Sequence, residues 1–159
     1  MLEISLESSR ISQNLVFEVC VNSPRSRYDQ SNGPFEGVVG FSQGASLATL
    51  ICSGAPSATL PELRFAVIMS GFCPADKALK AAVAAAAPLK IPAVVTHGKR
   101  DFNKQGSEQL AGMWAPGLAT LVEHGAGHVV PLSVHAGGKE VLEAVRMAAA
   151  QSTAGNHGF

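Results

Sequence analysis

The sequence has no excess of either charge and no long apolar run. Its 159 residues include 12 Lys or Arg and 12 Asp or Glu, so the formal net charge is zero. Without a basic patch, nucleic acid is not an expected partner. A membrane span needs about 20 consecutive apolar residues, and no such stretch is present. The amino end also lacks the basic start and apolar core of a signal peptide. These absences predict a cytoplasmic protein with no membrane span.

Cysteine is scarce as well. The three cysteines, Cys20, Cys52 and Cys73, are an odd number and lack a metal-binding spacing. We therefore expect buried thiols in a reducing compartment and no metal site. Apolar residues, by contrast, make up 47% of the chain, which is enough for the core of one domain.

Residues 37–54 carry the clearest local signal. An apolar pair at 38–39 leads into Gly-Phe-Ser-Gln-Gly at 40–44, and apolar residues at helical spacing follow until Gly54 and Pro56. A strand that turns at once into a helix, with Ser at the apex, is typical of a nucleophile elbow. We expect both flanking glycines to be needed because a Cβ there would collide with neighbouring chain. The alternative is an ordinary Gly-rich turn, but the strand before it and the helix after it favour the elbow.

Ser42, at the apex of this turn, is the candidate nucleophile. The strained turn should raise its hydroxyl above the carboxyl edge of the sheet. The N–H of Gln43 should point to the same space from a helix N-terminus, where backbone N–H groups lack intrahelical partners. We therefore expect Gln43 to supply an oxyanion donor.

Strands and helices are predicted to alternate along the chain. Apolar runs predict strands at residues 15–21, 64–70, 91–97 and 118–123, and helices at 78–87, 107–114 (capped by Ser107) and 139–150. The Ala-rich stretch at 78–87 could instead be a flexible lid. This alternation predicts an α/β fold with a mostly parallel sheet and flanking helices. The expected organisation is an atypical segment at 1–34, the domain at 35–150 and a frayed tail at 151–159.

The predicted strand exits bring together a nucleophile, an acid and a base. Functional groups gather beyond the carboxyl ends of parallel strands, and those exits carry Ser42, Asp101 and His128. Their order along the chain is that of α/β-hydrolases. Ser42 would attack a carbonyl carbon, and His128 would take its proton and pass it to the leaving group. Asp101 would fix the imidazole tautomer and stabilise the imidazolium.

Each role has an alternative candidate. His124 competes with His128 for the role of base, although only His128 lies deep in an exit loop. His97 ends a buried strand and is expected to be structural. Asp101 could be a solvated turn residue, and the other candidate acids are Asp76 and Glu108.

Several stretches resemble the FSH group of serine hydrolases. Residues 32–45 read Asn-Gly-Pro-Phe-Glu-Gly-Val-Val-Gly-Phe-Ser-Gln-Gly-Ala, like the elbow of that family. Ser-Gly-Phe at 70–72, Gly-Lys-Arg-Asp at 98–101 and Gly-His-Val-Val-Pro at 127–131 match in the expected order. The resemblance covers about residues 32–150. Acyl-protein thioesterases share the Gly-Phe-Ser-Gln-Gly core, so an enzyme of that type is an alternative.

The resemblance implies a small-molecule substrate, namely a carboxyl ester or thioester of an acyl chain. It implies catalysis by Ser42, Asp101 and His128 through an acyl-enzyme, with no metal or organic cofactor. Phe72 and Val129, near the predicted strand exits, are expected to line the acyl pocket.

One feature departs from the family pattern. Such hydrolases begin with a strand that ends in a His-Gly type loop, which supplies a second oxyanion N–H. Here 36 residues precede Gly37, and they contain no His. We therefore expect an N-terminally truncated α/β-hydrolase-like chain with reduced activity. The alternative is a catalytically impaired remnant that acts as a binding module.

Overall fold

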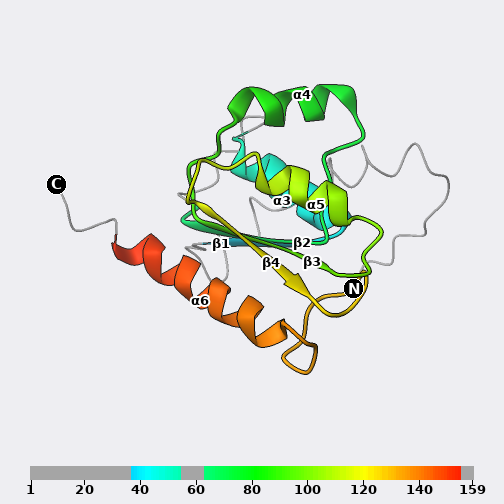
Figure 1. The fold of residues 1–159 in the computed structure, drawn as a ribbon. Helices are drawn as coiled ribbons and strands as arrows, with labels where there is room; N and C mark the ends of the chain where they lie inside the picture. The colour runs from blue at the N-terminus through cyan, green and yellow to red at the C-terminus, as the bar shows by residue number, and fades with distance from the viewer. Residues whose placement is uncertain (1–36, 55–62, 155–159) are drawn as a thin grey trace, which may run out of the picture. The chain divides into compact units, whose positions relative to one another are not determined.

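The described part of the chain, residues 37–54 and 63–154, is built on a parallel β-sheet (Figure 1). Within these residues four strands lie in chain order, and each pairs in parallel with the next. They are β1 (Gly37–Phe41), β2 (Phe65–Met69), β3 (Ala93–Gly98) and β4 (Ala119–His124). This computed structural model confirms the predicted α/β class. The predicted segment at 1–34, with its strand at 15–21, lies outside the described residues.

Helices cover both faces of the sheet. They are α3 (Gln43–Cys52), α4 (Lys77–Ala86), α5 (Lys104–Ala111) and α6 (Gly138–Ala154). Helices α3 and α5 pack on one face, α4 lies outside α3, and α6 packs on the opposite face (Figure 1). Crossovers between parallel strands are almost always right-handed. Because the strand order advances in one direction, the three connecting helices therefore fall on the same side.

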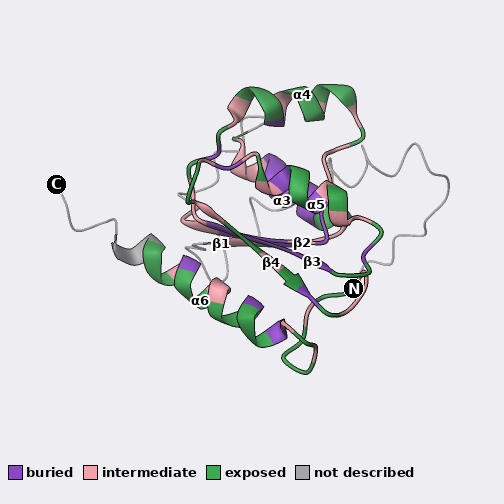
Figure 2. Cartoon of the chain, in the orientation of Figure 1, coloured by how far each residue is buried: buried purple, intermediate pink, exposed green. Residues whose placement is uncertain are grey.

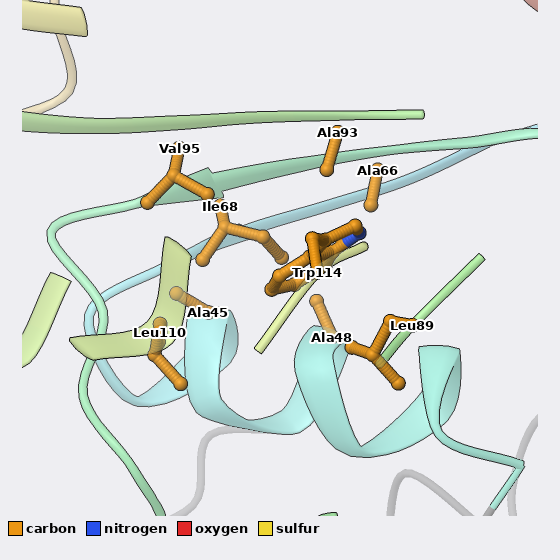
Figure 3. Packing of buried hydrophobic residues seen from close by; sticks show 9 residues of the cluster. All are labelled: Ala45, Ala48, Ala66, Ile68, Leu89, Ala93, Val95, Leu110 and Trp114. Carbon is orange, nitrogen blue, oxygen red and sulfur yellow. The ribbon is translucent and has the colours of Figure 1, made fainter. Parts of the chain in front are cut away.

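The main core lies between the sheet and the layer of α3 and α5. Small residues on α3, Ala45 and Ala48, let the helix lie close to the strands. Figure 3 shows Trp114 between α3 and the strands, among the side chains of the same cluster. The other members of this buried cluster are Ala66, Ile68, Leu89, Ala93, Val95 and Leu110. Such close packing fixes where each strand ends, and the site depends on those ends.

A second, thinner core lies under α6. Side chains alternate between the two faces along a strand, so Val67 and Val94 point away from α3 and toward α6. Both are buried, as are Val141 and Ala148 of α6. Figure 2 shows the rest of α6 as mainly exposed. Strand β3 is buried along its whole length because helices cover both of its faces.

Several helix boundaries differ from the prediction. Helix α5 begins at Lys104 rather than at the predicted cap, Ser107. Ser107 instead lies inside the helix, where its hydroxyl donates to the carbonyl of Gly71 (3.0 Å). The Ala-rich stretch forms α4, and Asp76 caps it by accepting hydrogen bonds from two backbone N–H groups. Helix α6 continues to Ala154, beyond the predicted end at residue 150.

Two further expectations concern the thiols and the membrane. Cys52 and Cys73 are free, and both are half-buried, whereas buried thiols were expected. The partial burial of Cys52 removes water from its thiol and raises its pKa to about 12. Cys20 lies outside the described residues. No helix within the described ranges has the length and apolar character that a bilayer span requires.

Candidate active site

Ser42 stands at a strained turn between β1 and α3. Its backbone has φ 55° and ψ −117°, a conformation that costs a non-glycine residue about 1–3 kcal/mol. The structure on either side holds this turn in place. The N–H of Ser42 donates to the carbonyl of Met69 at the end of β2 (2.9 Å), and its own carbonyl accepts the N–H of Ala45 in α3 (3.1 Å). The side chain is therefore presented at the carboxyl edge of the sheet.

The two glycines that flank Ser42 are not equivalent. A Cβ added at Gly40 would overlap the backbone of Gly44 and lie 2.7 Å from the Cα of Ala45. A Cβ added at Gly44 would meet nothing within 4 Å among the described residues. The steric explanation predicted for both positions therefore holds at Gly40 and is wrong at Gly44.

This contrast gives a matched pair of variants. Gly40→Ala should lower the free energy of unfolding by about 3 kcal/mol, because the methyl group has to displace backbone at the start of α3. Gly44→Ala should raise it by about 0.5–1 kcal/mol, because alanine is the better residue inside a helix. Urea denaturation of both variants measures the difference. Equal effects of the two substitutions would contradict the steric account.

Three side chains distant in sequence meet above this edge. The Nε2 atom of His128 lies 3.0 Å from the Oγ of Ser42, and its Nδ1 atom lies 2.9 Å from the Oδ1 of Asp101. The carboxylate of Asp101 can only accept, so Nδ1 carries the hydrogen. Nε2 is thereby left as an acceptor for the hydroxyl of Ser42. A base in this tautomer can remove the proton from the serine.

The loop that carries His128 is held against the end of β3. The N–H of Lys99 donates to the carbonyl of His124 (2.7 Å), and that of Arg100 donates to the carbonyl of Ala126 (3.2 Å). Gly98 is required for this approach because an added Cβ would overlap the carbonyl oxygens of the loop. The exits of β3 and β4 therefore bring Asp101 and His128 together.

Asp101 is buried, yet it is held in its ionised form. Burial raises its pKa, but the N–H of Asn103 (2.8 Å) and the imidazole of His128 (2.9 Å), both at Oδ1, help to outweigh burial and lower the pKa below its usual value. The carboxylate therefore remains charged at neutral pH. It can stabilise a positive imidazolium at His128.

Two phenyl rings contact the imidazole of His128. The ring of Phe41 has its centroid 5.0 Å away, and that of Phe102 lies at 4.3 Å. Each phenylalanine is the sequence neighbour of another member of the site: Phe41 precedes Ser42 and Phe102 follows Asp101. Sequence reasoning missed both residues, although their adjacency to the candidate nucleophile and acid was a usable signal. Phe102 is 79% exposed, so its ring also presents an apolar surface to solvent beside His128.

The competing candidates have other surroundings. His124 is 1% exposed at the end of β4, and neither ring nitrogen has a hydrogen-bond partner among the described residues. His97 is buried, and its Nε2 lies 3.8 Å from Glu108 of α5. Asp76 caps α4. Within the described ranges, His128 is the histidine that lies within hydrogen-bonding distance of Ser42.

The buried His124 leads to a prediction for stability. Burial and the nearby His135 lower its pKa, whereas Asp101 opposes the shift. The unfolded state therefore binds the proton more readily than the folded state. Stability should fall as the pH drops below about 6.5, by up to about 1.4 kcal/mol per pH unit, until the lowered pKa of His124 is reached. In His124→Phe this acid loss should be absent. Urea denaturation between pH 5 and 8 measures it, and an unchanged slope in the variant would contradict the assignment.

Three of the predicted residues remain, Gln43, Val129 and Phe72. Gln43 is exposed and is the first residue of α3, so helix geometry leaves its N–H without an intrahelical partner. Val129, which follows His128 in the chain, is 39% exposed. Phe72 is half-buried, and its carbonyl accepts the hydroxyl of Ser46 (2.5 Å). Among the described residues, no group of three or more His, Cys, Asp or Glu could hold a metal ion.

The fold of the described chain also occurs in solved structures of other proteins. Solved structures with the same fold include maize acyl-protein thioesterase 2, with a TM-score of 0.56 at 20% identity, covering 90% of this chain and 70% of that one. A fungal esterase from Rhizomucor miehei matches with a TM-score of 0.64 at 16% identity, over 94% of this chain and 62% of its own. The described chain therefore has an α/β-hydrolase-like fold.

The family follows from the sequence. The model of the serine hydrolase (FSH1) family matches residues 10–137, so the chain belongs to that family. Human esterase OVCA2 is 42% identical over 105 residues, which are 62% of this chain and 44% of that protein. Esterase FPY3 of Fusarium mangiferae is 35% identical over 113 residues, covering 65% of this chain and 52% of that protein. The chain thus spans about half the length of these curated relatives.

Proposed function

We propose that the chain is an esterase-type hydrolase that cleaves carboxyl esters or thioesters through an acyl-enzyme on Ser42. The observation that carries this proposal is the hydrogen-bonded series Ser42–His128–Asp101 above a strained elbow. Membership of a serine hydrolase family supports it. The expected cytoplasmic location stays a prediction.

In the first half of the proposed reaction, the Oγ of Ser42 attacks the carbonyl carbon of the substrate. The Nε2 of His128 accepts the hydroxyl proton, and Asp101 stabilises the resulting imidazolium. The N–H of Gln43 donates to the oxyanion that forms. The tetrahedral intermediate then collapses, and His128 returns the proton to the departing alcohol or thiol.

In the second half, water takes the place of the leaving group. His128 removes a proton from the water as its oxygen attacks the acyl carbon. The bond to Ser42 breaks, the serine oxygen recovers its proton from His128, and the carboxylic acid is released. The protein therefore returns to its starting state, and neither half requires a redox partner.

We propose that the acyl part of the substrate lies against the apolar side chains next to the base. Val129 and Phe102 are both exposed there, and Phe102 contacts the ring of His128. Phe72 stays a predicted lining residue. An apolar surface at this place favours an acyl chain over a charged group, because burying a charge without a partner is costly.

A fluorophosphonate probe tests the proposal directly. The probe labels a serine whose hydroxyl is activated by an adjacent base, so the folded protein should be labelled at Ser42. Labelling should disappear in Ser42→Ala and persist in Ser133→Ala, which changes an exposed serine in the same loop as the base. A folded sample that is not labelled would favour the binding-module alternative.

A panel of matched esters and thioesters then decides whether the preferred leaving group is an alcohol or a thiol. A thiol is the leaving group expected of an acyl-protein thioesterase-like enzyme.

A further inference from the structure

Ser70 lies at the end of β2 in a conformation that serine rarely adopts. Its φ is 52°, in the left-handed region where glycine is the usual residue. Its N–H donates to the carbonyl of Thr96 in the neighbouring strand (2.7 Å). The side chain is fully buried. A strained, buried serine at a strand exit needs an explanation in terms of what its hydroxyl does.

The hydroxyl of Ser70 and the carboxylate of Asp101 have complementary needs. The Oγ of Ser70 and the Oδ2 of Asp101 are both buried, and neither has a hydrogen-bond partner within 3.5 Å among the described residues. The other carboxylate oxygen, Oδ1, accepts the Nδ1–H of His128 and the N–H of Asn103. A buried hydroxyl needs an acceptor and a buried carboxylate oxygen needs a donor. Ser70 and Asp101 follow adjacent parallel strands, whose exits lie at the same edge.

We propose that Ser70 is a positioning residue, whose hydroxyl donates to the Oδ2 of Asp101 and thereby fixes the carboxylate that orients His128. This inference rests on the proposed function, because it assigns Ser70 a role in the same reaction. With the third donor in place, the carboxylate is held from both oxygens and cannot rotate away from the imidazole. The lowered pKa of Asp101 is consistent with this contact.

Two substitutions separate the hydroxyl from the backbone strain. Ser70→Ala removes the hydroxyl and keeps the strain, whereas Ser70→Gly removes the hydroxyl and relieves the strain. If the hydroxyl orients Asp101, both variants should lose about 10- to 100-fold in kcat, the loss expected for one hydrogen bond to a charged group, with little change in KM. Ser70→Gly should be the more stable variant, which keeps the test valid if Ser70→Ala folds poorly.

A second measurement requires no turnover. Loss of the Ser70 donor should raise the pKa of Asp101 toward its usual value, so the stability that its charge provides should be lost at a higher pH. The charged or titratable groups that face Asp101 are His128 and, at the end of β4, His124. The shift is measured by urea denaturation below pH 5, with the wild-type protein as the reference for the contribution of the two histidines. The control is Ser107→Ala, which deletes another buried hydroxyl bonded to the Gly71 carbonyl.

The result expected is a loss of kcat in both Ser70 variants together with an upward shift of their acid transition, and neither change in Ser107→Ala. Wild-type activity in Ser70→Gly, or a loss of kcat without the acid shift, would overturn the positioning role. Failure of the wild-type protein to react with the fluorophosphonate probe would instead overturn the proposed function. In that case the acid transition would still decide whether Ser70 contacts Asp101.

Discussion

Replacing Ser42 with alanine is expected to lower kcat for ester hydrolysis by about 10⁶-fold. The reason is that no acyl-enzyme can form without the Oγ atom. The N–H of Gln43 and the binding surface would remain, and they account for the small residual rate. Hydrolysis of a short p-nitrophenyl ester, followed with and without protein, measures the loss.

The substitution should leave the fold intact. Ser42→Ala removes the hydrogen bond between Oγ and His128, which is worth about 1 kcal/mol, and keeps the backbone bonds of the elbow. Ser133→Ala serves as the control for loss of a serine hydroxyl elsewhere. If Ser42→Ala hydrolysed the ester as fast as Ser133→Ala does, the nucleophile would have to be another residue.

Much of the fold could be predicted because the local patterns of apolar residues match the strands and helices that the chain forms. The apolar runs at 64–70 and 91–97 predict strands that helices cover on both faces, and they form β2 and β3. The alternation of strands and helices predicts the parallel order. The start of α5 could not be predicted, because Ser107 looks like a cap in the sequence. Its real partner, the Gly71 carbonyl, is 36 residues away.

Part of the candidate site could likewise be predicted from the sequence, and part could not. The order of Ser42, Asp101 and His128 can be read from the strand exits, because parallel strands end at one edge. The choice of His128 over His124 depended on a loop argument, and the structure puts His128 within hydrogen-bonding distance of Ser42. The contacts of Phe41 and Phe102 with the imidazole depend on the paths of two loops in three dimensions. No periodicity encodes such a contact.

The position of Ser70 lies beyond sequence reasoning for another reason. Ser-Gly-Phe at 70–72 is visible as a family motif, but a positive φ at a serine is not. Glycine would satisfy the backbone there with less strain. The side chain therefore has to be judged from its buried surroundings, which only the folded chain assembles.

Asp101→Asn is expected to lower kcat by about 10³- to 10⁴-fold while changing KM little. The side chain keeps its shape, and an amide oxygen in the place of Oδ1 could still accept the N–H of Asn103 and the Nδ1–H of His128. What is lost is the negative charge that stabilises the imidazolium. If the amide turns the other way, its NH₂ group faces Nδ1 and forces the wrong tautomer, which produces the larger loss.

Asp76→Asn is the matched control for Asp101→Asn. Asp76 also accepts the N–H of the second residue after it (2.9 Å), but it caps α4. Asparagine caps a helix as well as aspartate does, so this variant should retain wild-type kcat.

The two variants should also differ in their response to acid. The lowered pKa of Asp101 means that its charge stabilises the fold above its unfolded pKa, and that this stability is lost as the pH falls through the lower folded pKa. Asp101→Asn should lack that acid transition, and Asp76→Asn should keep it. An equal loss of kcat in both variants would rule out a specific role for the negative charge beside His128.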